Sequence, residues 1–84
     1  MQVKRIVNIL NSYNCEVAYT WHNRISFRLY GDRYEIRYNE DNKTYSFRKY
    51  GIINYISENR LYKDFKKDLI AYLDWWAIFY SYIK

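Results

Sequence analysis

The pattern of hydrophobic and polar positions changes its period twice along the chain, and each change marks a boundary between predicted elements. Near the N-terminus the apolar residues recur at i, i+3, i+4 and i+7, namely at Val3, Ile6, Val7 and Leu10. This spacing predicts an amphipathic helix of about three turns. The helix is expected to end in the polar run 11–14.

From Cys15 onward apolar and polar residues alternate, which is typical of strands that bury one face. Four such runs follow one another, at residues 15–21, 24–30, 33–38 and 44–48. Because the connections are short, neighbouring runs are expected to pair as an antiparallel meander.

The loops set the expected register, since residues directly opposite each other in an antiparallel pair share a face. The expected pairs are Trp21 with Ile25 across a bulged loop at 22–24, Leu29 with Tyr34 across Gly31-Asp32, and Tyr38 with Tyr45 across Asp41-Asn42. This register predicts an inner, apolar face formed by Val17, Tyr19, Trp21, Ile25, Phe27, Leu29, Tyr34, Ile36, Tyr38, Tyr45 and Phe47.

After Gly51 the pattern becomes helical again. Residues 52–56 fit either a helical turn or an extension of the preceding strand, whereas Ser57 is suited to cap a long helix that runs toward Lys84. The apolar stripe of that helix contains Leu61, Phe65, Leu69, Tyr72, Trp76 and Tyr80. The sequence therefore predicts one α+β domain over residues 1–84. It has a short N-terminal helix, a four-stranded antiparallel meander and a long C-terminal helix, with both helices packed on one sheet face.

The amino-acid composition of the chain excludes several classes of protein. Half of the 84 residues are hydrophobic and 23% are aromatic, which excludes intrinsic disorder. A single cysteine cannot form an internal disulfide, and residues 1–10 mix charged and apolar side chains unlike a secretion signal. We therefore expect a cytoplasmic protein, located in a host cell if a phage encodes it. The net charge of +5 favours an anionic partner.

The outer face of the predicted sheet concentrates arginine. It is expected to carry five of the seven arginines and no lysine: Arg24, Arg28, Arg33, Arg37 and Arg48. Guanidinium groups bind phosphate through a bidentate fork, and Tyr30 and Tyr50 at one end of the face are suited to stack on bases. The alternative is a solvated face stabilised by cross-strand ion pairs, with Glu35 between Arg28 and Arg48.

The C-terminal helix is apolar almost all round from Leu69 onward, although a helix that lies on one sheet needs only one apolar stripe. Contact with the N-terminal helix and with the isoleucines of 52–56 is one explanation. The other is a homodimer or partner interface formed by Trp75, Trp76, Ile78, Phe79 and Tyr82. A membrane anchor is disfavoured, because the run is short and contains Asp74.

Catalytic chemistry has little support in the sequence. His22 stands alone in a predicted loop, and Cys15 begins an inward-facing strand as a small core residue. No His, Cys and carboxylate set has metal-ligand spacing, and two glycines are too few for a phosphate-cradling loop. We expect no catalytic residues, no metal and no other cofactor.

Two resemblances bear on function. The order of elements, a helix, then a meander, then a helix that contains Lys66-Lys67, is similar to that of the double-stranded RNA-binding domain. That family has three strands and a Lys-Lys-x-Ala-Lys motif, whereas here Asp68 follows Lys67, so we do not assign the chain to it. The small size, the abundance of Asn, Ile, Lys and Tyr, and the lack of an enzymatic motif resemble small phage and mobile-element proteins that inhibit host defence, anti-CRISPR proteins among them.

The sequence thus predicts a non-enzymatic binding protein whose arginine-rich outer sheet face binds nucleic acid or a nucleoprotein. The alternative hypothesis is a phage or mobile-element inhibitor of a host defence nuclease, of the anti-CRISPR or anti-restriction type. Such an inhibitor would occlude a protein surface. Either its arginine-rich face would bind carboxylates, or the region of Trp75, Trp76 and Phe79 would supply the main contacts.

Overall fold

The protein is an α+β domain of two helices and one antiparallel sheet, seen here in a computed structural model that describes residues 1–83. The elements in chain order are α1 (Val3–Ser12), β1 (Glu16–Trp21), β2 (Arg24–Leu29), β3 (Asp32–Asn39), β4 (Thr44–Lys49), β5 (Ser57–Arg60) and α2 (Tyr62–Ile83). Neighbouring strands in the chain are neighbours in the sheet, in the order β1-β2-β3-β4-β5. The predicted α+β class is confirmed, but the sheet has five strands rather than four.

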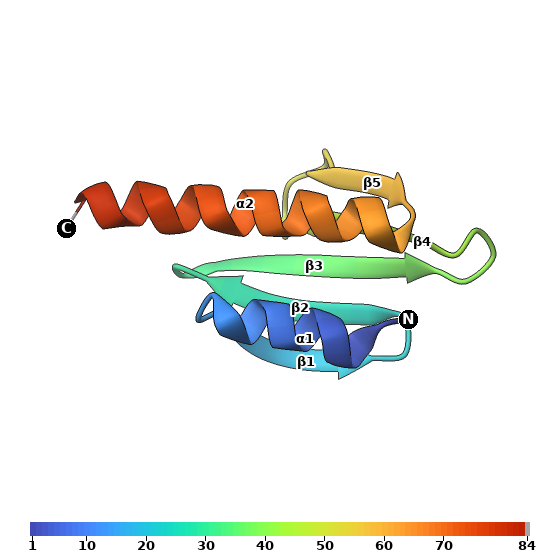
Figure 1. Ribbon diagram of the computed structural model, residues 1–84. Helices are drawn as coiled ribbons and strands as arrows, with labels where there is room; N and C mark the ends of the chain where they lie inside the picture. The colour runs from blue at the N-terminus through green and yellow to red at the C-terminus, as the bar shows by residue number, and fades with distance from the viewer. Residues whose placement is uncertain (84) are drawn as a thin grey trace.

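Both helices lie on the same face of the sheet (Figure 1), α1 over β1 and β2, and α2 over β4 and β5. The core fills the space between these layers. It is formed by Ile6 and Leu10 of α1, by Phe65, Leu69 and Leu73 of α2, and by Cys15, Ile25, Phe27, Leu29, Tyr34, Ile36, Tyr45 and Phe47 on the sheet side. An amphipathic helix and a sheet with alternating sequence each have one face to bury, and this arrangement buries both.

The extra strand, β5, is formed by residues that the sequence places in the C-terminal helix. Ser57 pairs with Phe47 of β4 and does not cap a helix; its hydroxyl donates a hydrogen bond of 2.8 Å to Asp68. Arg60 also contacts Asp68, at 3.0 Å, rather than the nearer residue Asp64. Backbone pairing and polar contacts hold β5, among them the Asn59 amide, which donates a hydrogen bond of 3.0 Å to the Ser46 hydroxyl. Its sequence has no alternating apolar pattern to reveal it.

The turn between β2 and β3 has two residues, as predicted, but it lies one residue earlier in the chain. Tyr30 and Gly31 form the turn, both with positive φ, so Leu29 pairs with Asp32 and Phe27 with Tyr34. The turn therefore uses glycine as its second residue, as a type I′ turn requires. The next hairpin keeps its predicted pairing of Tyr38 with Tyr45, although the turn spans four residues, 40–43.

In the β3–β4 turn the Asn39 side-chain oxygen accepts hydrogen bonds from two backbone amides, those of Asp41 and Asn42. Such an Asx arrangement satisfies amides that the ladder leaves free.

The first hairpin departs most from the prediction. Its turn is the two-residue His22-Asn23, with Trp21 paired to Arg24, and the bulge lies at Ala18 inside β1. One extra residue at that point reverses the faces of the rest of the strand. Tyr19 and Trp21 consequently lie on the outer face, 39% and 57% exposed, and not in the core as predicted.

α2 reaches beyond the sheet at its C-terminal end (Figure 1), which gives the molecule extents of 43 × 24 × 21 Å. Its buried side chains are Phe65, Leu69 and Leu73, whereas Leu61 precedes the helix and is exposed. Within the described part of the chain, neither helix is long and apolar enough to cross a membrane.

Buried acids, Cys15 and Tyr34 among them, make the fold sensitive to alkaline pH. Burial raises the pKa of the Cys15 thiol from 9.0 to about 11, and burial together with the Tyr72 hydroxyl raises the pKa of Tyr34. Both groups ionise first in the unfolded chain, so their contribution to stability is complete below pH 9 and is lost as the pH rises.

We expect the melting temperature to fall between pH 9 and 11, measured by circular dichroism in buffers of equal ionic strength. The variant Cys15→Ala should show a shallower decline, since one of these groups is gone. A melting temperature that stays constant from pH 8 to 11 would contradict this expectation.

Candidate nucleic-acid interface

The five predicted arginines lie together on the outer sheet face, the face away from the helices. We call Arg24, Arg28, Arg33, Arg37 and Arg48 the arginine face. The register places Arg28 opposite Arg33, and Arg24 opposite Arg37. Opposite residues lie about 5 Å apart and alternate residues of one strand about 6.7 Å apart. The five arginines therefore lie close together on this face.

Glu35 organises three of these arginines. It contacts Arg37 through a charge-assisted hydrogen bond, with Arg24 at 4.0 Å and Arg48 at 3.9 Å. The Glu35 side chain is only 5% exposed, so a buried carboxylate holds three partly exposed guanidinium groups. The predicted ion pair of Glu35 with Arg48 is confirmed, whereas Arg28 is not one of its partners, because the hairpin register is shifted by two residues. This cluster keeps a formal charge of +2.

The other two arginines are placed differently. Arg28 and Arg33 lie opposite each other and both are exposed. Among the described residues, no carboxylate lies within 4.0 Å of either guanidinium group. Glu16 of β1 lies opposite Arg28 on its other side, but like charges directly opposite each other destabilise a sheet, so the pair of Arg28 and Arg33 costs the fold stability. An anion placed between them would remove the repulsion.

Aromatic rings accompany the arginine face. Arg24 lies over the ring of Trp21 at 5.5 Å, and Arg33 lies over Tyr50 at 5.8 Å. Trp21 and Tyr50 are 57% and 58% exposed, so each ring keeps surface that a planar ligand can contact. Sequence reasoning missed Trp21, and also Tyr19, because the bulge at Ala18 leaves no mark in the hydrophobic pattern.

A hollow of about 410 Å³ lies in the middle of this face. Its lining combines the Glu35 cluster with aromatic and aliphatic side chains: Tyr19, Arg24, Glu35, Arg37, Arg48, Tyr50, Gly51, Ile52 and Ile53. The segment 50–56, which leads from β4 to β5, contributes the last four of these. It also places Tyr55 beside Arg48, with the guanidinium carbon 5.6 Å from the ring centre.

Tyr30 does not belong to this surface. It lies in the β2–β3 turn and stacks on Tyr80 of α2, with ring centres 3.8 Å apart. Tyr30 has a positive φ, so its backbone is not extended. Its side chain therefore does not continue the alternation of β2 on the outer face. The predicted place of Tyr30 beside Tyr50 on the outer face is therefore wrong, whereas base stacking by Tyr30 stays a prediction.

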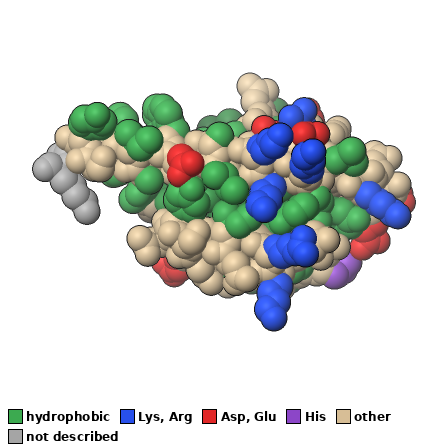
Figure 2. Space-filling model, viewed as in Figure 1, with side chains coloured by type: hydrophobic (Ala, Val, Ile, Leu, Met, Phe, Trp, Pro, Cys, Tyr) green, Lys and Arg blue, Asp and Glu red, His purple; other side chains and the backbone are tan. Residues whose placement is uncertain are grey.

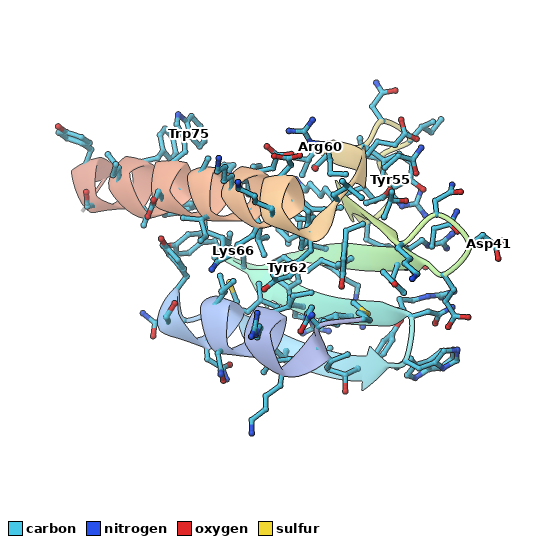
Figure 3. The ribbon with its side chains drawn as sticks, turned by 45° about the vertical axis from the view of Figure 1, so that its right-hand side comes forward. Asp41, Tyr55, Arg60, Tyr62, Lys66 and Trp75 are labelled. Atoms are coloured by element: carbon cyan, nitrogen blue, oxygen red, sulfur yellow. The ribbon has the colours of Figure 1, made fainter. Side chains whose placement is uncertain are left out.

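The C-terminal half of α2 forms a separate surface. Trp75, Ile78, Phe79 and Tyr82 are exposed, and we call these four residues the α2 end patch. Trp76, which the sequence groups with them, is half-buried and packs against Tyr72 and Tyr80. Figure 3 shows Trp75 on the side of α2 away from α1, so α1 does not cover it.

The structure places the two residues that the sequence considers for catalysis, His22 and Cys15, in different surroundings. His22 and Glu40 come within 3.9 Å of each other, both on exposed loops, and Cys15 is buried. No set of three or more His, Cys, Asp or Glu side chains within residues 1–83 could hold a metal ion.

Comparisons of this chain with protein-family models, with curated proteins and with solved structures found no match.

Proposed function

We propose that this protein is a non-enzymatic binding protein and that its arginine face binds nucleic acid, alone or within a nucleoprotein. The observation that supports this most is the exposed pair of Arg28 and Arg33, of which neither guanidinium group has a described carboxylate within 4.0 Å, beside the exposed ring of Tyr50. Phosphate groups suit paired guanidiniums, and bases suit exposed rings.

The shape of the surface favours single-stranded nucleic acid over a duplex. Trp21 and Tyr50 lie at different positions on an open sheet, each with an arginine over or beside the ring. Unpaired bases can stack on such rings while the backbone follows the cations, whereas bases inside a duplex are not free to do so.

The direct test is a fluorescence anisotropy titration with labelled single-stranded and double-stranded DNA and RNA at several salt concentrations. We expect micromolar or tighter binding that weakens with salt, with a log–log slope equivalent to several phosphate contacts. We also expect single strands to bind more tightly than duplexes of equal length. No binding at low salt would refute the proposal.

Removing the exposed indole should weaken single-strand binding without unfolding the protein. We expect Trp21→Ala to lower affinity about tenfold, since stacking contributes roughly 1–3 kcal/mol per base. Trp21→Phe should retain most of the affinity, because a phenyl ring still stacks. Equal affinities of both variants and of the parent chain would show that Trp21 serves only to support Arg24.

A second candidate function rests on the α2 end patch. It is a cluster of exposed aromatic and aliphatic side chains with no charged residue between Asp74 and Lys84, a composition that suits a protein partner. In this alternative the protein is a phage or mobile-element inhibitor that occludes a host defence nuclease, or it forms a homodimer. Sedimentation at several protein concentrations tests for the homodimer. Binding to a protein target would favour the inhibitor if the binding resists salt and persists after the arginines are replaced by glutamate.

A further inference from the structure

A groove of about 590 Å³ runs along one flank of α2, on the opposite side of the molecule from the arginine face. It is lined by Tyr62, Lys63, Lys66, Lys67, Ile70, Ala71 and Asp74. Figure 3 shows Tyr62 and Lys66 pointing from α2 toward α1. Asp74, at the end of the groove, accepts a hydrogen bond from the Tyr13 hydroxyl just beyond α1. The groove therefore follows the side of α2 that faces α1.

The floor of this groove is apolar and its edge is basic. Ile70 and Ala71 keep exposed surface there, and the three lysines are all exposed. In Figure 2 hydrophobic side chains fill the strip between the two helices, and Lys and Arg side chains lie along it. Apolar surface next to cations is typical of sites that take an amphipathic ligand.

The lysines lack partners of their own. Among the described residues, no carboxylate lies within 4.0 Å of the amino groups of Lys63, Lys66 or Lys67. Of the three acids of the same helix, Asp68 binds Ser57 and Arg60, Asp74 binds Tyr13, and Asp64 does not line the groove. The positive charge of this edge is therefore available to a ligand.

We propose that this groove binds an acidic amphipathic helix of a partner protein. From Tyr62 to Asp74 the groove lining covers thirteen residues of α2, or about 18 Å, slightly more than three helical turns. Apolar side chains at i, i+3, i+4 and i+7 of the partner would contact Ile70 and Ala71, and its flanking carboxylates would face the lysines. Asp74 at the far end makes the groove asymmetric and sets the direction of the bound helix.

The test uses a labelled 14-residue peptide with leucines on one helical face and glutamates beside them. A control peptide has the same composition with the leucines distributed around the helix. We expect saturable binding of the first peptide, at least tenfold weaker binding of the control, and amide shift changes in NMR spectra confined to residues 62–74 and the facing side of α1.

The lysine reversal Lys66→Glu with Lys67→Glu should weaken peptide binding at least tenfold. Ala71→Arg puts a bulky cation on an exposed part of the groove floor and should also weaken peptide binding at least tenfold. This variant replaces the lysine reversal in the test if that double variant unfolds. The matched control reverses two charges on the other face, Arg28→Glu with Arg33→Glu, and should leave peptide affinity within twofold. Because the sites lie on opposite faces, failure of one proposal does not imply failure of the other.

Three results would overturn the proposal. The first is equal binding of the two peptides or no saturable binding of either. The second is binding of dodecanoate without binding of the peptide, which would assign the groove to small anionic amphiphiles. The third is self-association that Ala71→Arg abolishes, which would assign the groove to a second copy of this chain.

Discussion

Reversal of Arg28 and Arg33 to glutamate is expected to lower affinity for single-stranded nucleic acid by about 100-fold or more at moderate salt. These two side chains are exposed and opposite each other, and neither guanidinium group has a described carboxylate within 4.0 Å, so the fold loses only the surface contact of Arg33 with Tyr50 when they are replaced. Each phosphate contact they make is removed, and two new negative charges repel the backbone. The neutral pair Arg28→Gln with Arg33→Gln should show an intermediate loss and a salt slope shallower by about two.

The choice of these two residues follows from the structure. Arg37 lies on the same face, but its guanidinium binds the buried Glu35, so its reversal would disturb folding as well as binding. The charge-matched control is Lys66→Glu with Lys67→Glu on the helical side, which should change nucleic-acid affinity only by the small, general effect of net charge. Equal losses in the two double variants would mean that binding is non-specific attraction to a basic protein.

The sequence predicted the content of the arginine face although it mispredicted the pairing. The β2–β3 hairpin is shifted by two residues from the expected register, and a shift of two leaves each side chain on its original face. Arg28 therefore lies on the outer face as predicted, but opposite Arg33 instead of Glu35.

A bulge has the opposite consequence. The extra residue at Ala18 shifts the register of β1 by one, which transfers Tyr19 and Trp21 to the outer face. Both residues are large and apolar, so a sequence pattern assigns them to the core by default. Their exposure depends on one unpaired residue that no periodicity reveals.

β5 could not be predicted for a different reason. Its residues bury little apolar surface, and Ser57 and Arg60 are held by Asp68 of α2, eleven and eight residues further along the chain. The same residues fit an N-terminal cap and the first turn of a helix, so local preference and tertiary contact disagree here and the tertiary contact prevails.

Replacement of Glu35 by glutamine is expected to lower the free energy of unfolding by about 3 kcal/mol. The side chain is 5% exposed and lies among three guanidinium groups, so its loss leaves them with mutual repulsion and no central acceptor of equal strength. Urea denaturation measures the loss directly. A double-mutant cycle with Arg37→Gln should give a coupling of about 1–3 kcal/mol between the two residues. A loss below about 0.5 kcal/mol would show that Glu35 is not an anchor.

The same variant separates the structural role of the cluster from its role in binding. One case is that Arg24, Arg37 and Arg48 contribute to binding only through their positive charge. In that case the folded Glu35→Gln variant should bind single-stranded nucleic acid a few-fold more tightly, because the net charge rises by one and three guanidinium groups lose their carboxylate partner. If instead Glu35 holds them in the geometry that phosphates require, affinity should fall despite the added charge. The exposed Arg28 and Arg33 need no such support, so we expect the first result, with tighter binding and lower stability in one substitution.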